Sequence, residues 1–271
     1  MELYTRIMGS GPPLIILHGL FGLSDNWVSI ARRLSASYTV YLPDQRNHGR
    51  SPHHQVFNYY ALSDDLMAFM DSREIDKAVL LGHSMGGKVA MHFALDYPEM
   101  TDKLIVADMG TGSYQVRPVH NKIMEAMESV DFDSLDTREA VEEHLSAYID
   151  SRPLRLFIMK NLKRLPKGRL GWKPNLPVLK KSMGEIVEGL SPGPTYNQPT
   201  LFVAGGRSDY IKEADHQDIQ KFFPKARIEV IPHGSHWLHA DATEAFCDIV
   251  SHFLDSTCYN NTDLRKKSGA S

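Results

Sequence analysis

Short, predominantly apolar runs of four to six residues recur along the first part of the chain and again after residue 198. Runs of this kind are typical of strands that are buried on both faces of a sheet. They occupy residues 14–17, 39–42, 78–81, 104–107 and 199–204. A weaker alternation over residues 3–8 indicates a first strand, and residues 227–231 are expected to form the final one.

Between these runs, apolar residues repeat every three or four positions, which is the period of a helix with one buried face. Such helices are expected at about residues 27–34, 60–70, 89–97, 215–223 and 243–254. Strands that alternate with helices predict an α/β fold, in which helices cover both faces of a mostly parallel, twisted sheet.

The alternation stops at residues 112–195, where no comparable apolar run occurs. Amphipathic helices are expected there at about residues 117–129, 137–148, 153–162 and 176–190, with a loop over residues 168–174. The pattern divides the chain into a core of residues 1–111 and 196–255, an insertion of residues 112–195, and a mostly polar, flexible C-terminal tail of residues 256–271.

The apolar run 78–81 leads directly into Gly82-His83-Ser84-Met85-Gly86, and a helical pattern begins immediately afterwards. Strand, tight turn and helix form the context of a nucleophile elbow. Gly82 and Gly86 leave room for the strained turn that presents the serine. Free N–H groups at the start of the following helix can stabilise a developing oxyanion. Ser84 is therefore a candidate nucleophile.

The same stretch nearly matches a second motif, the phosphate-binding loop, as Gly82-x4-Gly87-Lys88. That motif continues with a serine or threonine, which holds Mg²⁺. Here the position is Val89, so the nucleotide-binding alternative lacks its metal ligand and is disfavoured.

Polar residues follow the expected strands at the points where these strands end, namely His18, Ser84, Asp108, Asp209 and His236. The carboxyl ends of parallel strands share one edge of a sheet, which is where open α/β folds bind ligands. Residues far apart in the sequence are therefore expected to meet at this edge.

Composition narrows the classes of protein without choosing a reaction. The chain of 271 residues is 42% hydrophobic and 23% charged, with a net charge of −3, which is ordinary for a globular protein and gives no indication of a nucleic-acid partner. The sequence contains no apolar run of about 18 residues, so no membrane span is expected. The N-terminus has no signal-peptide pattern, and the two cysteines provide no disulfide framework, so a cytoplasmic location is expected.

In combination, several motifs resemble those of the α/β-hydrolase superfamily, and more narrowly those of the YbfF-type esterases and the abhydrolase-domain 11 proteins. The matching stretches are His18-Gly19-Leu20-Phe21-Gly22, Asp44-x-Arg46-Asn47-His48-Gly49-x-Ser51, Gly82-His83-Ser84-Met85-Gly86-Gly87-Lys88, Gly205-Gly206-x-Ser208-x-Tyr210 and Gly234-x-His236-Trp237. The order of nucleophile, acid and histidine is also that of the superfamily.

The resemblance implies hydrolysis of a small-molecule carboxylic ester, with a short- to medium-chain acyl group, through an acyl-enzyme and without a cofactor or metal. It also implies that residues 112–195 form a helical cap. We predict that apolar side chains of this cap wall an acyl pocket, with Met124, Met127, Leu156, Phe157 and Met159 as candidates. Ser84 is then the nucleophile and His236 the base that activates it. His233 and His239 are rivals of His236 for the role of base. The spacing of three residues between these histidines could also indicate a metal site, but the loop offers no further acidic ligand.

Two residues compete for the role of the acid that orients His236. The commonest hydrolase arrangement places it after the penultimate strand, at Asp209, whereas the YbfF-type pattern places it at Asp108, with Ser208 as an auxiliary hydrogen-bonding residue. We favour Asp108. The oxyanion donors are expected to be the backbone N–H groups of Met85 and of Leu20 or Phe21.

Other activities remain open on the same fold. The alternatives are an acyl-CoA thioesterase, a C–C hydrolase or a MenH-type lyase, and a non-catalytic small-molecule receptor. The basic residues of the insertion are most simply a solvated face, although they could attract an anionic substrate such as an acyl-CoA.

Overall fold

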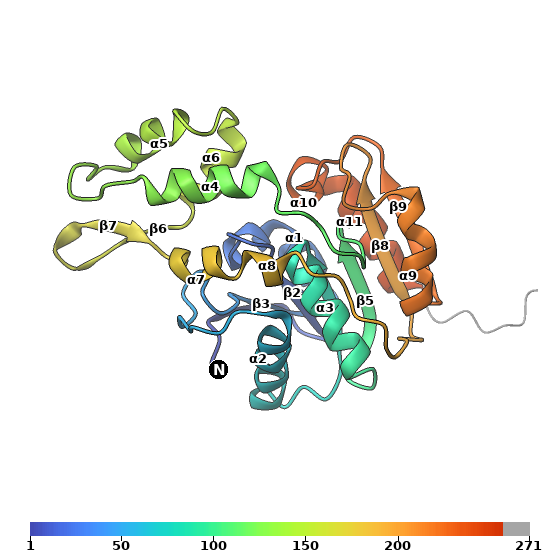
Figure 1. Cartoon of the computed structure of the whole chain (residues 1–271). Helices are drawn as coiled ribbons and strands as arrows, with labels where there is room; N and C mark the ends of the chain where they lie inside the picture. Colours follow the sequence, from blue (N-terminus) through green and yellow to red (C-terminus); the bar gives the residue numbers. More distant parts are fainter. Residues whose placement is uncertain (257–271) are drawn as a thin grey trace, which may run out of the picture.

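The computed structural model describes residues 1–256, which form a seven-stranded sheet flanked by helices (Figure 1). The strands of this sheet are β1 (Thr5–Met8), β2 (Pro13–Leu17), β3 (Thr39–Pro43), β4 (Ala78–His83), β5 (Thr101–Ala107), β8 (Thr200–Gly205) and β9 (Ala226–Ile231). The expected C-terminal tail lies, apart from Ser256, outside the described residues.

The order of the strands across the sheet is β1-β3-β2-β4-β5-β8-β9. The edge strand β1 pairs with β3 in the antiparallel sense, and all the other pairs are parallel. The last residues of neighbouring strands are in register, with Leu17 opposite Gly82 and His83 opposite Ala107. The carboxyl ends therefore form one edge, and the predicted α/β class with its mostly parallel sheet is confirmed.

Helices cover both faces of the sheet because the strands are apolar on both sides. On one face, α1 (Val28–Leu34) contacts α11 (Thr243–Asp255), and their apolar residues share a core with alternate residues of the central strands. On the other face, α2 (Tyr59–Ser72), α3 (Met85–Asp96) and α9 (His216–Phe222) pack on the second core. A short helix, α10 (Leu238–Asp241), precedes α11.

The chain between β5 and β8 forms a separate layer, which is seen above the sheet in Figure 1. It contains α4 (Pro118–Glu128), α5 (Arg138–Ser146), α6 (Arg152–Met159), the hairpin of β6 (Leu162–Arg164) and β7 (Leu170–Trp172), and the short helices α7 (Leu176–Lys181) and α8 (Met183–Ile186). Direct hydrogen bonds tie this layer to the core, including those from Asn161 Nδ2 to the Phe21 carbonyl, 2.8 Å, and from the Tyr59 hydroxyl to the Ile186 carbonyl, 2.5 Å.

Two expectations for this segment were wrong in detail. The expected loop over residues 168–174 contains β7, because Lys167 and Gly168 adopt left-handed conformations, with φ of 66° and 83°, that turn the chain back on itself. The expected single helix over residues 176–190 is two short helices, because Ser182 leaves helical geometry between them. No helix among residues 1–256 is both long enough and apolar enough to cross a membrane.

Candidate active site

Ser84 occupies a strained turn between β4 and α3. Its backbone has φ of 54° and ψ of −121°, which a residue with a side chain rarely adopts. A Cβ atom on Gly82 would lie 2.2 Å from the Gly86 carbonyl oxygen, and one on Gly86 would lie 2.3 Å from the Leu17 carbonyl oxygen. Both glycines are therefore required sterically, and the turn projects the serine at the N-terminus of α3.

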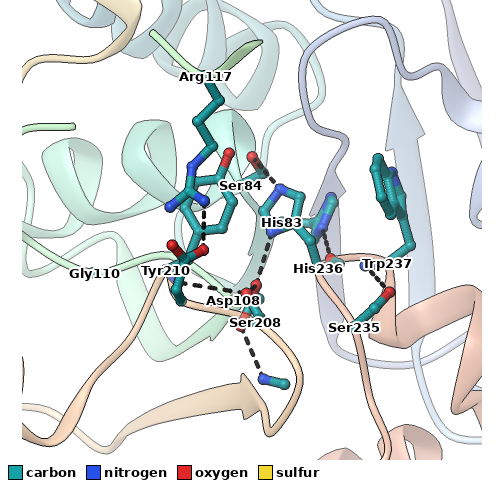
Figure 2. A network of polar contacts seen from close by, with 12 residues as sticks. His83, Ser84, Asp108, Gly110, Arg117, Ser208, Tyr210, Ser235, His236 and Trp237 are labelled. Carbon is teal, nitrogen blue, oxygen red and sulfur yellow. Dashed lines mark hydrogen bonds and ion pairs between the residues drawn. The ribbon is translucent and has the colours of Figure 1, made fainter. Parts of the chain in front are cut away.

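His236 and Asp108 complete a hydrogen-bonded chain with this serine (Figure 2). His236 Nε2 lies 3.0 Å from Ser84 Oγ, and His236 Nδ1 lies 2.7 Å from Asp108 Oδ2. The fully buried Asp108 carboxylate also accepts the Gly205 N–H at 2.8 Å and the Ser208 hydroxyl hydrogen. Three donors thus converge on one carboxylate, which holds it in place beside His236.

Asp209 points elsewhere. Its carboxylate forms an ion pair and hydrogen bond with Arg117, which belongs to the segment leading into α4, and its side chain is 60% exposed. The hydrogen bond from Arg117 is the main cause that lowers the pKa of Asp209. The structure therefore places Asp108, and not Asp209, on His236.

Aromatic and imidazole rings hold His236 from both sides. The ring of Tyr210 stacks on it at 3.9 Å between centroids, and the Arg117 guanidinium covers the other face of Tyr210 at 3.8 Å. His83 Nε2 lies 2.7 Å from the backbone carbonyl of His236 and donates to it. Burial is the main cause that lowers the pKa of His83 to about 3, so this neighbour stays neutral.

The sequence pattern alone did not predict roles for Tyr210, Arg117 and His83, although Tyr210 and His83 lie inside the matching motifs. Both residues lie at or shortly after the carboxyl end of a strand, and this position could have identified them as candidates. Arg117 belongs to the insertion, where no motif marked it.

The two candidate oxyanion donors of the loop after β2 differ in their partners. The Phe21 N–H donates to His48 Nε2 at 3.1 Å, so it is already engaged. Burial lowers the pKa of His48 to about 3, which keeps this ring a neutral acceptor. Leu20 lines the same cavity as Ser84, and Met85 is the first residue of α3, where N–H groups lack acceptors within the helix. This geometry favours Leu20 and Met85.

The polar residues around His18 and Asp44 serve as a brace for that loop. His18 Nε2 accepts the Gln45 N–H at 3.0 Å, and its Nδ1 lies 2.8 Å from the Gly19 carbonyl. The Asp44 carboxylate accepts backbone N–H groups of Ser24, 2.6 Å, and Arg50, 2.9 Å. These contacts use the polar atoms within the fold, so this turn is not arranged as a second catalytic centre.

A cavity of about 290 Å³ opens above Ser84. Its apolar lining includes Leu20, Val119, Ile123, Phe157 and Trp237. Among the cap side chains expected to wall an acyl pocket, Phe157 lines this cavity and Leu156 lines an adjoining groove. Met124, Met127 and Met159 are instead buried in the apolar core.

The three histidines that could have formed a metal site do not converge. His233 is exposed, whereas His239 is buried and stacks on Trp27 at 4.4 Å between ring centroids. Within residues 1–256, no three His, Cys, Asp or Glu side chains are grouped in a way that could hold a metal ion.

Lys88 is fully buried one turn after Ser84 in the nucleophile helix α3. Its ammonium group donates to the carbonyls of Thr111, 2.9 Å, and Gly112, 2.7 Å, where the chain leaves Asp108 for the insertion. Burial lowers the pKa of Lys88 to about 7. Its position anchors the start of the insertion and is unlike that of a lysine in an open phosphate loop.

This burial predicts a pH-dependent contribution to stability. Unfolded Lys88 keeps its proton up to about pH 10.4 and folded Lys88 loses it near pH 7, so the unfolded state binds more protons in between. The free energy of unfolding of the wild type, relative to Lys88→Met, should therefore rise by about 1 kcal/mol per pH unit between pH 7.5 and 9.5. Urea unfolding of both proteins across this range measures the difference. The exposed Lys181→Met is the matched control and should give no slope, and a flat profile for Lys88→Met would show that Lys88 stays charged.

Comparisons with known proteins agree with this geometry. The alpha/beta hydrolase fold family matches residues 12–140. The chain is 37% identical to the sn-1-specific diacylglycerol lipase ABHD11 of Danio rerio over 91% of this chain and 79% of that protein. It is 34% identical to esterase YbfF of Escherichia coli (strain K12) over 90% of this chain and 93% of that protein. A solved structure of a marine microorganism esterase matches 93% of this chain and 99% of its own with a TM-score of 0.91 and 42% identity.

Proposed function

This chain belongs to the alpha/beta hydrolase family, as the sequence resemblance predicted, and we propose that it hydrolyses carboxylic esters with Ser84 as the nucleophile. The single observation that carries the proposal is the hydrogen-bonded series from Ser84 Oγ through His236 to Asp108. Esterase and lipase relatives that align over most of the chain support the same class of reaction.

In the first half of the reaction, Ser84 Oγ attacks the ester carbonyl carbon while His236 Nε2 takes its proton. Asp108 stabilises the resulting imidazolium, and the N–H groups of Leu20 and Met85 receive the charge that develops on the carbonyl oxygen. The C–O bond to the alcohol then breaks, and the leaving oxygen takes the proton back from His236. An acyl group remains on Ser84.

Water completes the cycle. His236 removes a proton from a water molecule as its oxygen attacks the acyl-enzyme, and the ester bond to Ser84 breaks. Ser84 recovers its proton, and the carboxylic acid leaves. No cofactor enters either half, since the side chains at the site supply every proton transfer.

The walls and the volume of the cavity above Ser84 limit the size of the substrate. We take residues 112–195 as a cap over the core of residues 1–111 and 196–255, because α4 and α6 supply Val119, Ile123 and Phe157 to the cavity wall. A cavity of about 290 Å³ lies at the lower end of the roughly 300–1,000 Å³ typical of small-molecule sites, which favours short- to medium-chain acyl esters.

Labelling with a fluorophosphonate probe tests the proposal directly and separates it from the non-catalytic receptor. The activated serine should displace fluoride and form one covalent adduct per chain, which peptide mapping should place on Ser84. Ser235 lines the same cavity, so Ser235→Ala is the matched control and should label fully, whereas Ser84→Ala should not label. Absence of labelling in the wild type, or an adduct on another serine, would overturn the assignment.

A further inference from the structure

A second hollow continues outward from the cavity above Ser84. This outer groove has a volume of about 640 Å³ and runs between α6 of the cap and α10 of the core. It shares five lining residues with the Ser84 cavity: Asn26, Phe157, Ser235, Trp237 and His239. The groove is thus continuous with the reaction site.

The walls of the outer groove are mainly apolar and accessible to solvent. The cap contributes Pro153, Leu154 and Leu156, and the Leu156 side chain is 45% exposed. Polar groups, among them Ser151, Lys160 and Asp241, also line it. An apolar chain that enters the groove would cover these side chains and gain free energy from the surface removed from water.

The position of the groove relative to His236 decides which half of an ester it can receive. The leaving oxygen must lie within about 2.6–3.2 Å of His236 Nε2, which returns the proton. Tyr210 closes one face of that ring by stacking at 3.9 Å. His83 lies beside the His236 ring on the side away from Tyr210, and Trp237 lies beyond it in Figure 2 and lines the groove. His236 and Trp237 both line the Ser84 cavity, which continues past Trp237 into the groove, so the groove is the side open to the alcohol.

A second space beside Ser84, which His236 does not line, is much smaller. A void of about 20 Å³ is lined by Ser84, Met85 and Met109, and it is closed by the hydrogen bond between Tyr59 and the Ile186 carbonyl. A cavity of about 10–15 Å³ by this kind of measure holds one water molecule, so this void accepts a group about the size of a methyl.

We infer that the preferred substrates are esters of a very short acid, such as acetate, with a long apolar alcohol whose chain lies in the outer groove between α6 and α10. The inference rests on the proposed ester hydrolysis and narrows its acyl group from the short- to medium-chain range to the shortest members of that range. It assigns the large binding surface to the leaving group and the small one to the acyl group.

Isomeric esters test this assignment without a change in overall hydrophobicity. Octyl acetate and ethyl octanoate have the same formula, but they place the long chain on the alcohol and on the acid, respectively. Octyl acetate should be hydrolysed with a kcat/KM at least about tenfold higher, since each buried methylene can contribute up to about fourfold. Among acetates, the gain from ethyl to octyl should appear mainly as a lower KM, because all of them form the same acetyl-enzyme.

Leu156→Asp tests the groove itself. This variant should lose most of the advantage of octyl acetate, about tenfold in kcat/KM, and should hydrolyse ethyl acetate at the wild-type rate. Leu165→Asp is the matched control, because Leu165 is a similarly exposed cap leucine, 36% exposed, that does not line the groove. It should leave both substrates unchanged.

The outcomes separate this inference from the proposed function. A preference for ethyl octanoate, or equal losses on both acetates in Leu156→Asp, would overturn the inference and leave ester hydrolysis in place. A dimer by light scattering that Leu156→Asp converts to a monomer, without a change in substrate preference, would assign the groove to a second copy of the chain and overturn it too. Failure of the wild type on every ester would instead overturn the proposed function.

Discussion

Ser84→Ala is expected to lower kcat/KM for short esters such as p-nitrophenyl acetate by about 10⁴–10⁶-fold. The hydroxyl is the atom that forms the acyl-enzyme, so its removal takes away the covalent route rather than one contribution to it. The remaining rate should come from the oxyanion donors and from binding, which act on attack by water. Steady-state kinetics with purified protein measure the loss.

The fold should survive this substitution. Ser84 Oγ is hydrogen-bonded to His236, and its removal leaves the backbone turn and the two glycines in place. Thermal unfolding and circular dichroism should therefore match the wild type, which excludes misfolding as the cause of a loss. A variant that retained a tenth of wild-type activity would show that another residue performs the attack.

The sheet could be predicted from the sequence because a strand that is buried on both faces appears as a short, continuous run of apolar residues. The central strands β4 and β5 contain unbroken apolar runs, whereas the edge strands β1 and β9 alternate, and β1 was the weakest prediction. Parallel pairing then brings the strand ends together, which is why His236 and Asp108 could be named as possible neighbours across 128 positions of sequence.

The choice between Asp108 and Asp209 depends on local backbone geometry, which cannot be inferred from the residue types alone. Asp108 has φ of 48°, which turns its side chain toward His236, while Asp209 turns outward to Arg117 of the insertion. Likewise, the hydrogen bond between Phe21 and His48 removes one of two neighbouring amides from the oxyanion site. Each of these contacts joins segments whose relative position only the folded chain defines.

The insertion was predicted least well for a related reason. Its short helices bury only narrow apolar stripes, so their ends are set by contacts with the core rather than by their own periodicity. The hairpin of β6 and β7 depends on two left-handed residues, and Lys167 is not a residue type that indicates such a turn. The outer groove arises where α6 meets α10, and its residues are scattered over the sequence.

Asp108→Asn and Asp209→Asn are expected to differ in activity by orders of magnitude. Asp108→Asn should lower kcat by about 10²–10⁴-fold, because an amide cannot hold His236 in the required tautomer or stabilise its charged form. The environment adds to the loss, since the Gly205 N–H, the Ser208 hydroxyl and His236 Nδ1 all converge on this carboxylate. An amide group that turns its NH₂ toward any of these donors leaves that donor without an acceptor.

Asp209→Asn is the matched control, since it makes the same chemical change one loop away. Its side chain is largely exposed, and an amide oxygen can still accept the hydrogen bond from Arg117. We therefore expect less than about a tenfold loss in kcat, because surface ion pairs of this kind contribute little. Kinetics of both variants on one short ester, with unfolding temperatures to verify folding, give the ranking. The reverse ranking would place the acid after β8. Comparable losses would mean that both carboxylates support His236, Asp108 directly and Asp209 through Arg117 and the stacked Tyr210.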